Sequence, residues 1–174
     1  MINTNATLNN TGTITVKDSG RMMFDTNTTL TNTGDITVKD SGRMMFDTNT
    51  TQTNTGTITL KDSSYIHIYK STLNNTGTID ISNITDLSYW SNAGTFKLEG
   101  GSTFVLPKSI HTTNSNNFNI TLNGTKDNPV NIVIPKYCEY ITDINKTTEY
   151  LFNAIEEATG LTFDGNKDNV KFSW

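Results

Sequence analysis

The sequence predicts an all-β protein, a parallel β-helix (β-solenoid) of about six coils with a small C-terminal α+β cap. The first observation is a repeat with a step of 22 residues, in which residues 11–25 return as residues 33–47 with one change, Thr13 to Asp35. The second is that polar and apolar residues alternate within each repeat, as in strands with one buried face. The third is that apolar positions recur once per repeat without mirror symmetry about the turns, which favours stacked parallel coils over antiparallel hairpins.

Residues 1–107 carry the repeats, with looser copies at 55–69 and 76–90 and a shortened copy at 93–107. Alignment on the glycines predicts two inward columns in the strand after each glycine: Ile14, Ile36, Ile58, Ile79 and Phe96, then Val16, Val38, Leu60, Ile81 and Leu98. The following strand supplies Met22, Met44, Ile66, Leu87 and Phe104, then Phe24, Phe46, Ile68, Tyr89 and Leu106. Leu8, Leu30 and Leu73 mark a third inward position, where Gln52 interrupts the pattern.

The chain is divided by composition into a solenoid of about 22-residue coils at 1–135 and a cap at 136–174. A further coil is expected at 118–135. In the cap, residues 146–159 have helical spacing, with Thr147 or Thr148 at the start and Gly160 at the end. Segments 161–163 and 170–174 flank turn residues and are interpreted as a hairpin. The cap is expected to cover unpaired strand edges, and no comparable cap precedes Leu8, so the first coil is predicted to be open to a further copy or to further sequence.

Bulk composition excludes several classes of function. The formal charge of −4 gives no support to nucleic-acid binding, and no apolar run approaches the 18 or so residues of a membrane span. No basic and apolar leader precedes the first repeat, which leaves the export route open. The single Cys138 excludes a disulfide within the chain and is interpreted as a small buried group.

Stacking like residues places like charges on adjacent strands, which costs tenths of a kcal/mol per pair. Neighbouring aspartates are expected to offset this repulsion. Asp18, Asp40 and Asp62 lie beside Lys17, Lys39 and Lys61, and Asp25 and Asp47 lie near Arg21 and Arg43.

No enzyme motif is present in the sequence, so we predict no catalytic residue, metal or cofactor. Two histidines, His67 and His111, and one cysteine are too few for a repeated metal motif. Because many β-helix proteins cleave polysaccharides with clustered carboxylates, the acidic residues that break the repeat, Asp80, Asp86 and Glu99, are the only candidates for that alternative.

Outward positions of the second strand predict a contact surface. If the alternation holds, six side chains form one strip, which we call the contact strip: Met23, Met45, Tyr65, His67, Tyr69 and Trp90. Exposed methionine and aromatic groups anchor protein or glycan partners. The strip is a candidate for ligand recognition or for packing between subunits. Alternatively, the C-terminal cap or the polar loop at 108–117 folds back over it.

The segments 8–14, 30–36 and 73–79 share the pattern Leu-x-Asn-x-Gly-x-Ile. Over residues 2–106 the chain resembles the filamentous-haemagglutinin-type adhesins and autotransporter passengers, which are right-handed parallel β-helices on bacterial surfaces. The resemblance implies the same handedness and a corner ladder of amides that bond the next coil: Asn10, Asn32, Asn54 and Asn75.

The expected function is that of a non-enzymatic extracellular solenoid, a rigid adhesive or a self-assembling fibre element. Its partner would be a protein or glycan ligand, or further copies bound through the open first coil. The alternatives are a viral tail-fibre or tailspike module on a virion and, third, a polysaccharide-cleaving enzyme.

Overall fold

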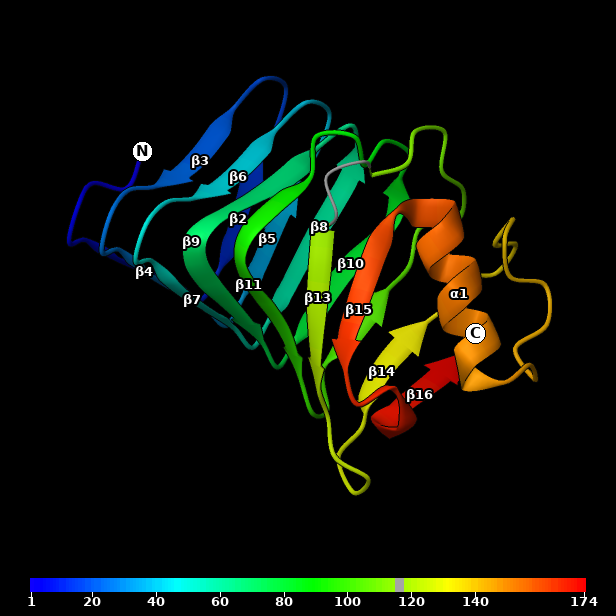
Figure 1. Ribbon diagram of the computed structural model, residues 1–174. Coiled ribbons are helices and arrows are strands. Elements are labelled where there is room, and N and C mark those ends of the chain that lie inside the picture. Colours follow the sequence, from blue (N-terminus) through cyan, green and yellow to red (C-terminus); the bar gives the residue numbers. More distant parts are fainter. Residues whose placement is uncertain (115–117) are drawn as a thin grey trace.

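The computed structural model describes residues 1–114 and 118–174, and its chain winds into a parallel β-solenoid (Figure 1). All strand pairs that the described residues form between named strands are parallel. They build a nine-stranded and a seven-stranded sheet, which confirms the predicted parallel β-helix.

Each coil presents its strands on up to three faces. The first face carries β1 (Thr7–Asn10), β4 (Thr29–Asn32), β7 (Thr51–Asn54), β9 (Tyr65–Asn75), β11 (Ser91–Glu99), β13 (Phe118–Asn123) and β15 (Leu161–Gly165). The second carries β2 (Thr13–Val16), β5 (Asp35–Val38), β8 (Thr57–Asp62), β10 (Thr78–Ile84), β12 (Thr103–Val105), β14 (Val130–Val133) and β16 (Val170–Ser173). The third carries β3 (Arg21–Phe24), β6 (Arg43–Phe46) and the first residues of β9 and β11.

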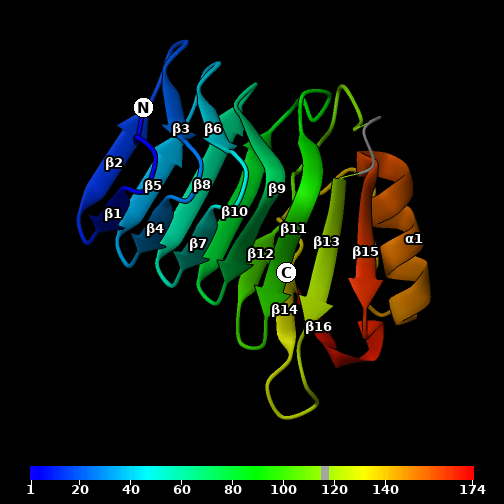
Figure 2. The ribbon, with the colours of Figure 1, turned by 60° about the vertical axis from the view of Figure 1, so that its left-hand side comes forward.

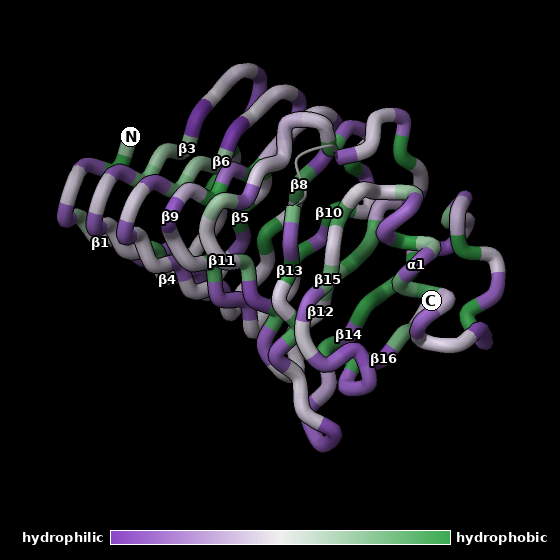
Figure 3. The backbone as a smooth tube through the Cα atoms, in the orientation of Figure 1, coloured by the Kyte–Doolittle hydropathy of each residue, from purple (hydrophilic) through white to green (hydrophobic). Residues whose placement is uncertain are grey.

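The first coils stack in the predicted register. Ile14 pairs with Ile36, and Ile36 pairs with Ile58. Ile36 and Ile58 are fully buried. Polar and apolar residues alternate along the strands, whereas the turn that joins β13 to β14 is hydrophilic (Figure 3). The alternation therefore assigns one row of side chains to the core and the other to the surface.

The corner between the first and second faces holds the predicted amide ladder. The Nδ2 atoms of Asn10, Asn32 and Asn54 each donate to the Oδ1 atom of the next asparagine, at 2.7, 2.7 and 2.6 Å. Each Nδ2 also donates to the carbonyl oxygen of the glycine two residues later. The last member, Asn75, is fully buried. These hydrogen bonds confirm the ladder and join each corner to the next coil.

A glycine lies two residues after each of these asparagines, because the backbones of neighbouring coils approach closely at this corner. A Cβ atom built on Gly34 would lie 2.2 Å from the carbonyl oxygen of Gly12, and one on Gly56 would lie 2.1 Å from that of Gly34. No L-residue side chain fits at such distances without moving the backbone. On Gly12, which no described coil precedes, the added atom meets nothing within 4 Å.

The predicted columns are wrong at the fifth repeat, whereas Ile79 in the fourth repeat still pairs with Ile58 as predicted. Phe96 pairs with Leu73 on the first face, and Phe104 pairs with Ile79 on the second. The reason is a change in coil length: the step is 21 from Ile58 to Ile79 but 24 from His67 to Ser91. Gly94 therefore lies inside β11, and residues 100–101 form the turn at the corner between the first and second faces.

The further coil expected at 118–135 is present, and its first strand, β13, pairs with β11 on the first face. Strand β14 then lies on the second face, paired with β12.

The helix of the cap was predicted correctly, but the hairpin was not. α1 runs over Thr148–Thr159, Thr147 Oγ1 accepts the N–H of Tyr150, and Gly160 has left-handed geometry. β15 and β16 do not pair with each other; they lie parallel to β13 and β14. The turn residues, including the 3₁₀ helix η1 (Lys167–Asn169), form a corner between two faces and do not reverse the chain. The last strands therefore continue the solenoid.

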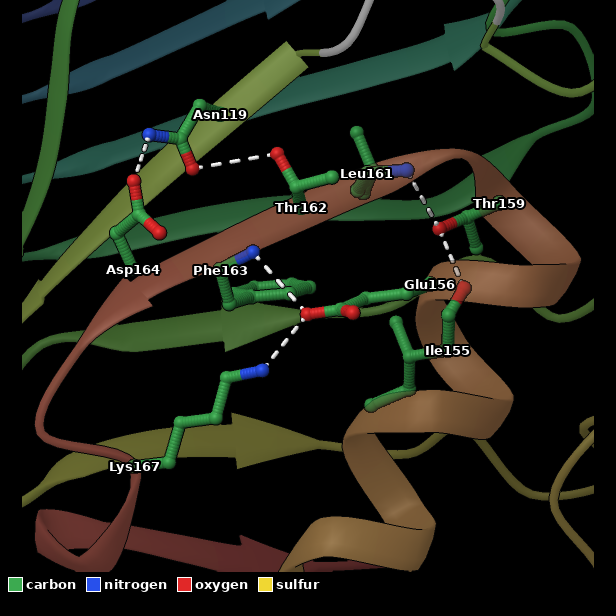
Figure 4. Close-up of polar contacts among 9 residues, drawn as sticks. All are labelled: Asn119, Ile155, Glu156, Thr159, Leu161, Thr162, Phe163, Asp164 and Lys167. Atoms are coloured by element: carbon green, nitrogen blue, oxygen red, sulfur yellow. Dashed lines mark hydrogen bonds and ion pairs between the residues drawn. The ribbon is translucent and has the colours of Figure 1, made fainter.

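Helix α1 lies at the C-terminal end of the solenoid (Figures 1 and 2). The Phe152 ring contacts the rings of Phe163 and Phe172, with centroids 5.2 and 5.3 Å apart. In Figure 4, Glu156 Oε1 accepts the N–H of Phe163 at 3.3 Å and a hydrogen bond from Lys167 Nζ at 2.9 Å. These contacts hold the helix against the last coil.

Cys138 is buried before the helix, as the sequence predicts. Nearby, the hydroxyl of Tyr140 donates to the Pro107 carbonyl oxygen at 2.7 Å, and burial raises the pKa of Tyr140 above its ordinary value.

The N-terminal end differs from the C-terminal end. β1 and β2 are the outermost strands of their sheets. Leu8, Ile14 and Val16 are only partly buried, whereas Leu30, Ile36 and Val38, their counterparts one coil on, are at most 1% exposed. Among the described residues, no helix has the length and apolar character that a membrane crossing requires.

Candidate functional site

Three columns of outward side chains cover the third face of the first three coils. β3, β6 and β9 are paired in register, with Met23 opposite Met45 and Met45 opposite His67. On one side of this central column lie Arg21, Arg43 and Tyr65, and on the other lie Asp25, Asp47 and Tyr69. The 22-residue repeat thus builds a basic column, an apolar column and an acidic column side by side.

A groove of about 540 Å³ runs over this face. Met23 and Met45 are half-buried in its wall, and Tyr69 is 38% exposed. Its lining residues are Met1, Met23, Phe24, Asp25, Met45, Phe46, Asp47, His67 and Tyr69. The groove therefore combines thioether and aromatic surface with two carboxylates, and Met1 is a component that the sequence pattern did not predict.

The aromatic part of the groove is held by contacts with its neighbours. The His67 ring stacks on Tyr69 with centroids 6.2 Å apart, and its Nδ1 atom forms a hydrogen bond with Ser91 Oγ. The guanidinium of Arg43 lies over the Tyr65 ring at 5.2 Å from its centroid. These contacts restrict the conformations that the side chains can adopt.

The carboxylates of the groove are engaged with hydroxyl and amide groups. Asp25 accepts the Thr26 N–H at 2.7 Å and the Thr4 hydroxyl at 2.8 Å, and these hydrogen bonds lower the pKa of Asp25. Asp47 accepts the Thr48 N–H at 2.7 Å. The lowered pKa keeps Asp25 ionised at neutral pH.

The arginines and aspartates of the third face do not pair with each other. Within the described ranges the ion pairs are Lys146–Asp143 and Lys167–Glu156, both in the C-terminal part. Asp25 and Asp47 therefore do not form ion pairs with the arginines. In a strand, residues four apart are separated by about 13 Å, because each residue advances the chain by about 3.3 Å.

Trp90 does not belong to the contact strip. It is fully buried, and its indole Nε1 donates to the Ser64 carbonyl oxygen at 3.2 Å. Tyr89, which was expected to point inward, is 64% exposed and contacts the Tyr65 ring at 5.8 Å between centroids. Both residues lie in a turn between β10 and β11, where the Trp90 N–H donates to the Leu87 carbonyl oxygen at 3.1 Å, so the alternation of a strand does not apply to them.

The cap does not cover the strip. α1 packs against β15 and η1, at the end of the solenoid away from β3 and β6 (Figure 1). The described part of the loop at 108–117 also lies elsewhere, since the backbone of Thr112 pairs with Asp86 and Leu87. Its last three residues, 115–117, lie outside the described residues.

The acidic residues that break the repeat, Asp80, Asp86 and Glu99, each accept a hydrogen bond. Asp80 accepts the Ser82 N–H at 2.8 Å, and Asp86 accepts that of Ser88 at 2.8 Å, so both carboxylates close local turns. Glu99 Oε2 accepts a hydrogen bond from Asn123. Within the described ranges, no three His, Cys, Asp or Glu side chains gather as metal ligands would.

A second hollow of about 560 Å³ lies beside Lys136, Tyr137 and Trp174 at the C-terminal end. Tyr137 and Trp174 are 82% and 54% exposed. The sequence pattern gave no signal for this hollow, because its residues lie outside the repeats.

Comparison of the chain with protein-family models finds no match, and comparisons with curated proteins and with solved structures find none either. The class of the protein, a parallel β-solenoid, is therefore assigned from its strand pairing and register.

Proposed function

We propose that this chain is a non-enzymatic extracellular β-solenoid that acts as a rigid adhesive or self-assembling surface element. The observation that carries the proposal is the uncovered groove on the third face, lined by Met23, Met45, His67 and Tyr69. An exposed apolar patch with aromatic groups and a charged rim is typical of contact surfaces.

Rigidity supports the same proposal. The in-register coils and the corner ladder of asparagines give each side chain of the groove a fixed position relative to the coil before and the coil after it. A surface on regular strands is pre-organised, so a partner does not have to order it on binding.

The N-terminal end is the second proposed contact region. β1 and β2 present edge N–H and C=O groups beside the partly exposed Leu8, Ile14 and Val16. Such an edge accepts a further strand by backbone pairing. We propose that further copies of the chain, or further coils, bind there.

The proposal is tested by immobilising the chain and probing it with a glycan array and with soluble copies of itself. We expect binding to at least one probe, and we expect Tyr69→Ala to weaken it about tenfold, which corresponds to about 1.4 kcal/mol. Tyr150→Ala, on α1, removes an exposed tyrosine far from the groove and should leave binding unchanged. Absence of binding to every probe, or equal loss in both variants, would contradict the proposal.

A further inference from the structure

The outer third face has a charge pattern that is complementary to itself. Along β3 the outward residues run Arg21, Met23 and then Asp25, and one coil later the same order is repeated by Arg43, Met45 and Asp47. None of these four charges takes part in an ion pair in the described part of the chain. The face therefore carries a positive and a negative column on the two sides of a methionine column, with no internal neutralisation.

A two-fold rotation brings opposite charges together. This two-fold axis lies parallel to the solenoid axis, in front of the Met23–Met45 column. Rotation by 180° reverses the strand direction of the second copy and keeps each coil level with its counterpart. Arg21 then faces the Asp25 of the second copy, Arg43 faces its Asp47, and methionine meets methionine. In the third coil, Tyr65 faces the Tyr69 of the other copy.

The regular spacing of the coils repeats this match between the two copies in each of the first three coils. Neighbouring coils are about 4.8 Å apart in both copies, and outward residues on one strand are about 6.6 Å apart. Since both copies have the same two spacings, alignment at one coil aligns the others. Rotation about an axis parallel to the strands instead places arginine on arginine, which is repulsive. The charge pattern thus selects one orientation among the two-fold arrangements.

We propose that the third face binds a second copy of this chain in this two-fold, side-by-side arrangement. This inference rests on the proposed function, because it assigns the partner of the same contact surface. The groove leaves space beside the methionine column for side chains of the second copy. Three coils present less than the roughly 800 Å² per partner of a standard interface. The pairing is therefore weak between free chains and becomes strong where many copies are held side by side.

The experiment measures self-association by sedimentation velocity over a concentration series, at low and high salt. The wild-type chain is expected to form dimers that weaken as salt screens the charges. Two charge-reversed variants, Arg21→Glu/Arg43→Glu and Asp25→Lys/Asp47→Lys, should each weaken self-association at least about tenfold, because all charges on each variant face then have one sign. An equal mixture of the two should recover association as a heterodimer.

Matched controls separate this geometry from general electrostatics and from misfolding. Lys17→Glu/Lys39→Glu makes the same charge change beside the second face and should leave dimerisation intact. Because Asp25 and Asp47 cap local turns, circular dichroism should verify the fold of each variant. Met45→Glu removes no hydrogen bond and should also abolish the dimer.

Several outcomes would overturn the inference: a wild-type chain that stays monomeric at its highest soluble concentration, variants that dimerise like the wild type, or a mixture that fails to recover association. If the monomeric chain still binds a glycan and Tyr69→Ala weakens that binding, the proposed contact surface stands and only its pairing with a second copy is wrong.

Discussion

The N-terminal and C-terminal halves of the solenoid are held together differently. In the first four coils, buried asparagines at one corner form a continuous hydrogen-bonded ladder. In the next coil the register places Leu98 opposite Asn75, and Leu122 follows, so the ladder ends. Beyond this point the interior is aromatic, with ring contacts that link Trp90, Phe96, Phe104, Phe118, Phe163 and Phe152.

The ladder depends on the residue type at the corner as well as on its backbone position. A ladder of short hydrogen bonds requires the same backbone position in each coil, which a nearly constant step provides. In the next coil the backbone is still in register at this corner, but Leu98 has no side-chain donor or acceptor to continue the ladder. Aromatic packing depends on burial and ring contact more than on one donor–acceptor distance, so it tolerates coils of different length.

The largest expected effect is in the aromatic half. Phe152→Ala removes the ring that α1 places against Phe163 and Phe172, so we expect it to lower the free energy of unfolding by about 3–5 kcal/mol. Urea denaturation followed by circular dichroism measures the change. Tyr150→Ala, on the exposed side of the same helix, should change stability by less than about 0.5 kcal/mol. Equal losses of stability in the two variants would show that the packing of α1 on the last coil does not stabilise the fold.

The next largest effect tests the close approach of neighbouring coils in the N-terminal half. Gly56→Ala places a Cβ atom 2.1 Å from the Gly34 carbonyl oxygen and should destabilise the fold by about 3 kcal/mol. Gly12→Ala is the matched control, because the same change at the first corner meets no atom within 4 Å. Melting temperatures of the two variants give the comparison. Equal values would mean that the coils do not touch at this corner.

A smaller loss of stability is expected when one asparagine side chain of the ladder is removed. Asn54→Ala leaves Asn32 Nδ2 and the carbonyl oxygens of Gly56 and Thr78 without this partner, which should cost about 2 kcal/mol. Asn9→Ala, an exposed asparagine, should be nearly neutral. Hydrogen exchange should show faster opening near residue 54 if the ladder joins the coils, and no change if packing alone does so.

The smallest effect is a gain in stability. Gln52 is fully buried between Leu30 and Leu73, and neither its Nε2 nor its Oε1 atom has a hydrogen-bond partner in the described structure. Gln52→Leu should stabilise the fold by about 1 kcal/mol, because it removes unsatisfied polar atoms and keeps the volume. Gln52→Ala should instead destabilise it by opening a cavity. A loss of stability in the leucine variant would indicate that the amide has a partner in solution.

Local patterns predicted much of the molecule correctly. The inward columns of the first three coils, the asparagine ladder and both ends of α1 follow from short-range signals: alternation, repeated residues and caps. The same reasoning failed for Trp90 and Phe96, because a glycine alignment does not reveal extra residues within a coil. Of the six residues of the contact strip, Met23, Met45, His67 and Tyr69 line the groove and Trp90 is buried, and the role of the strip in binding stays a prediction.

The sequence by itself determined that coils of the chain stack like on like, since identical residues at a constant step can satisfy burial and backbone pairing in every coil at once. Only the tertiary structure decided where that regularity ends. The pairing of β15 with β13, and of β16 with β14, depends on which strand edges remain free after the longer coils have packed. A turn sequence permits either a reversal or a corner, and the neighbouring coil determines which one forms.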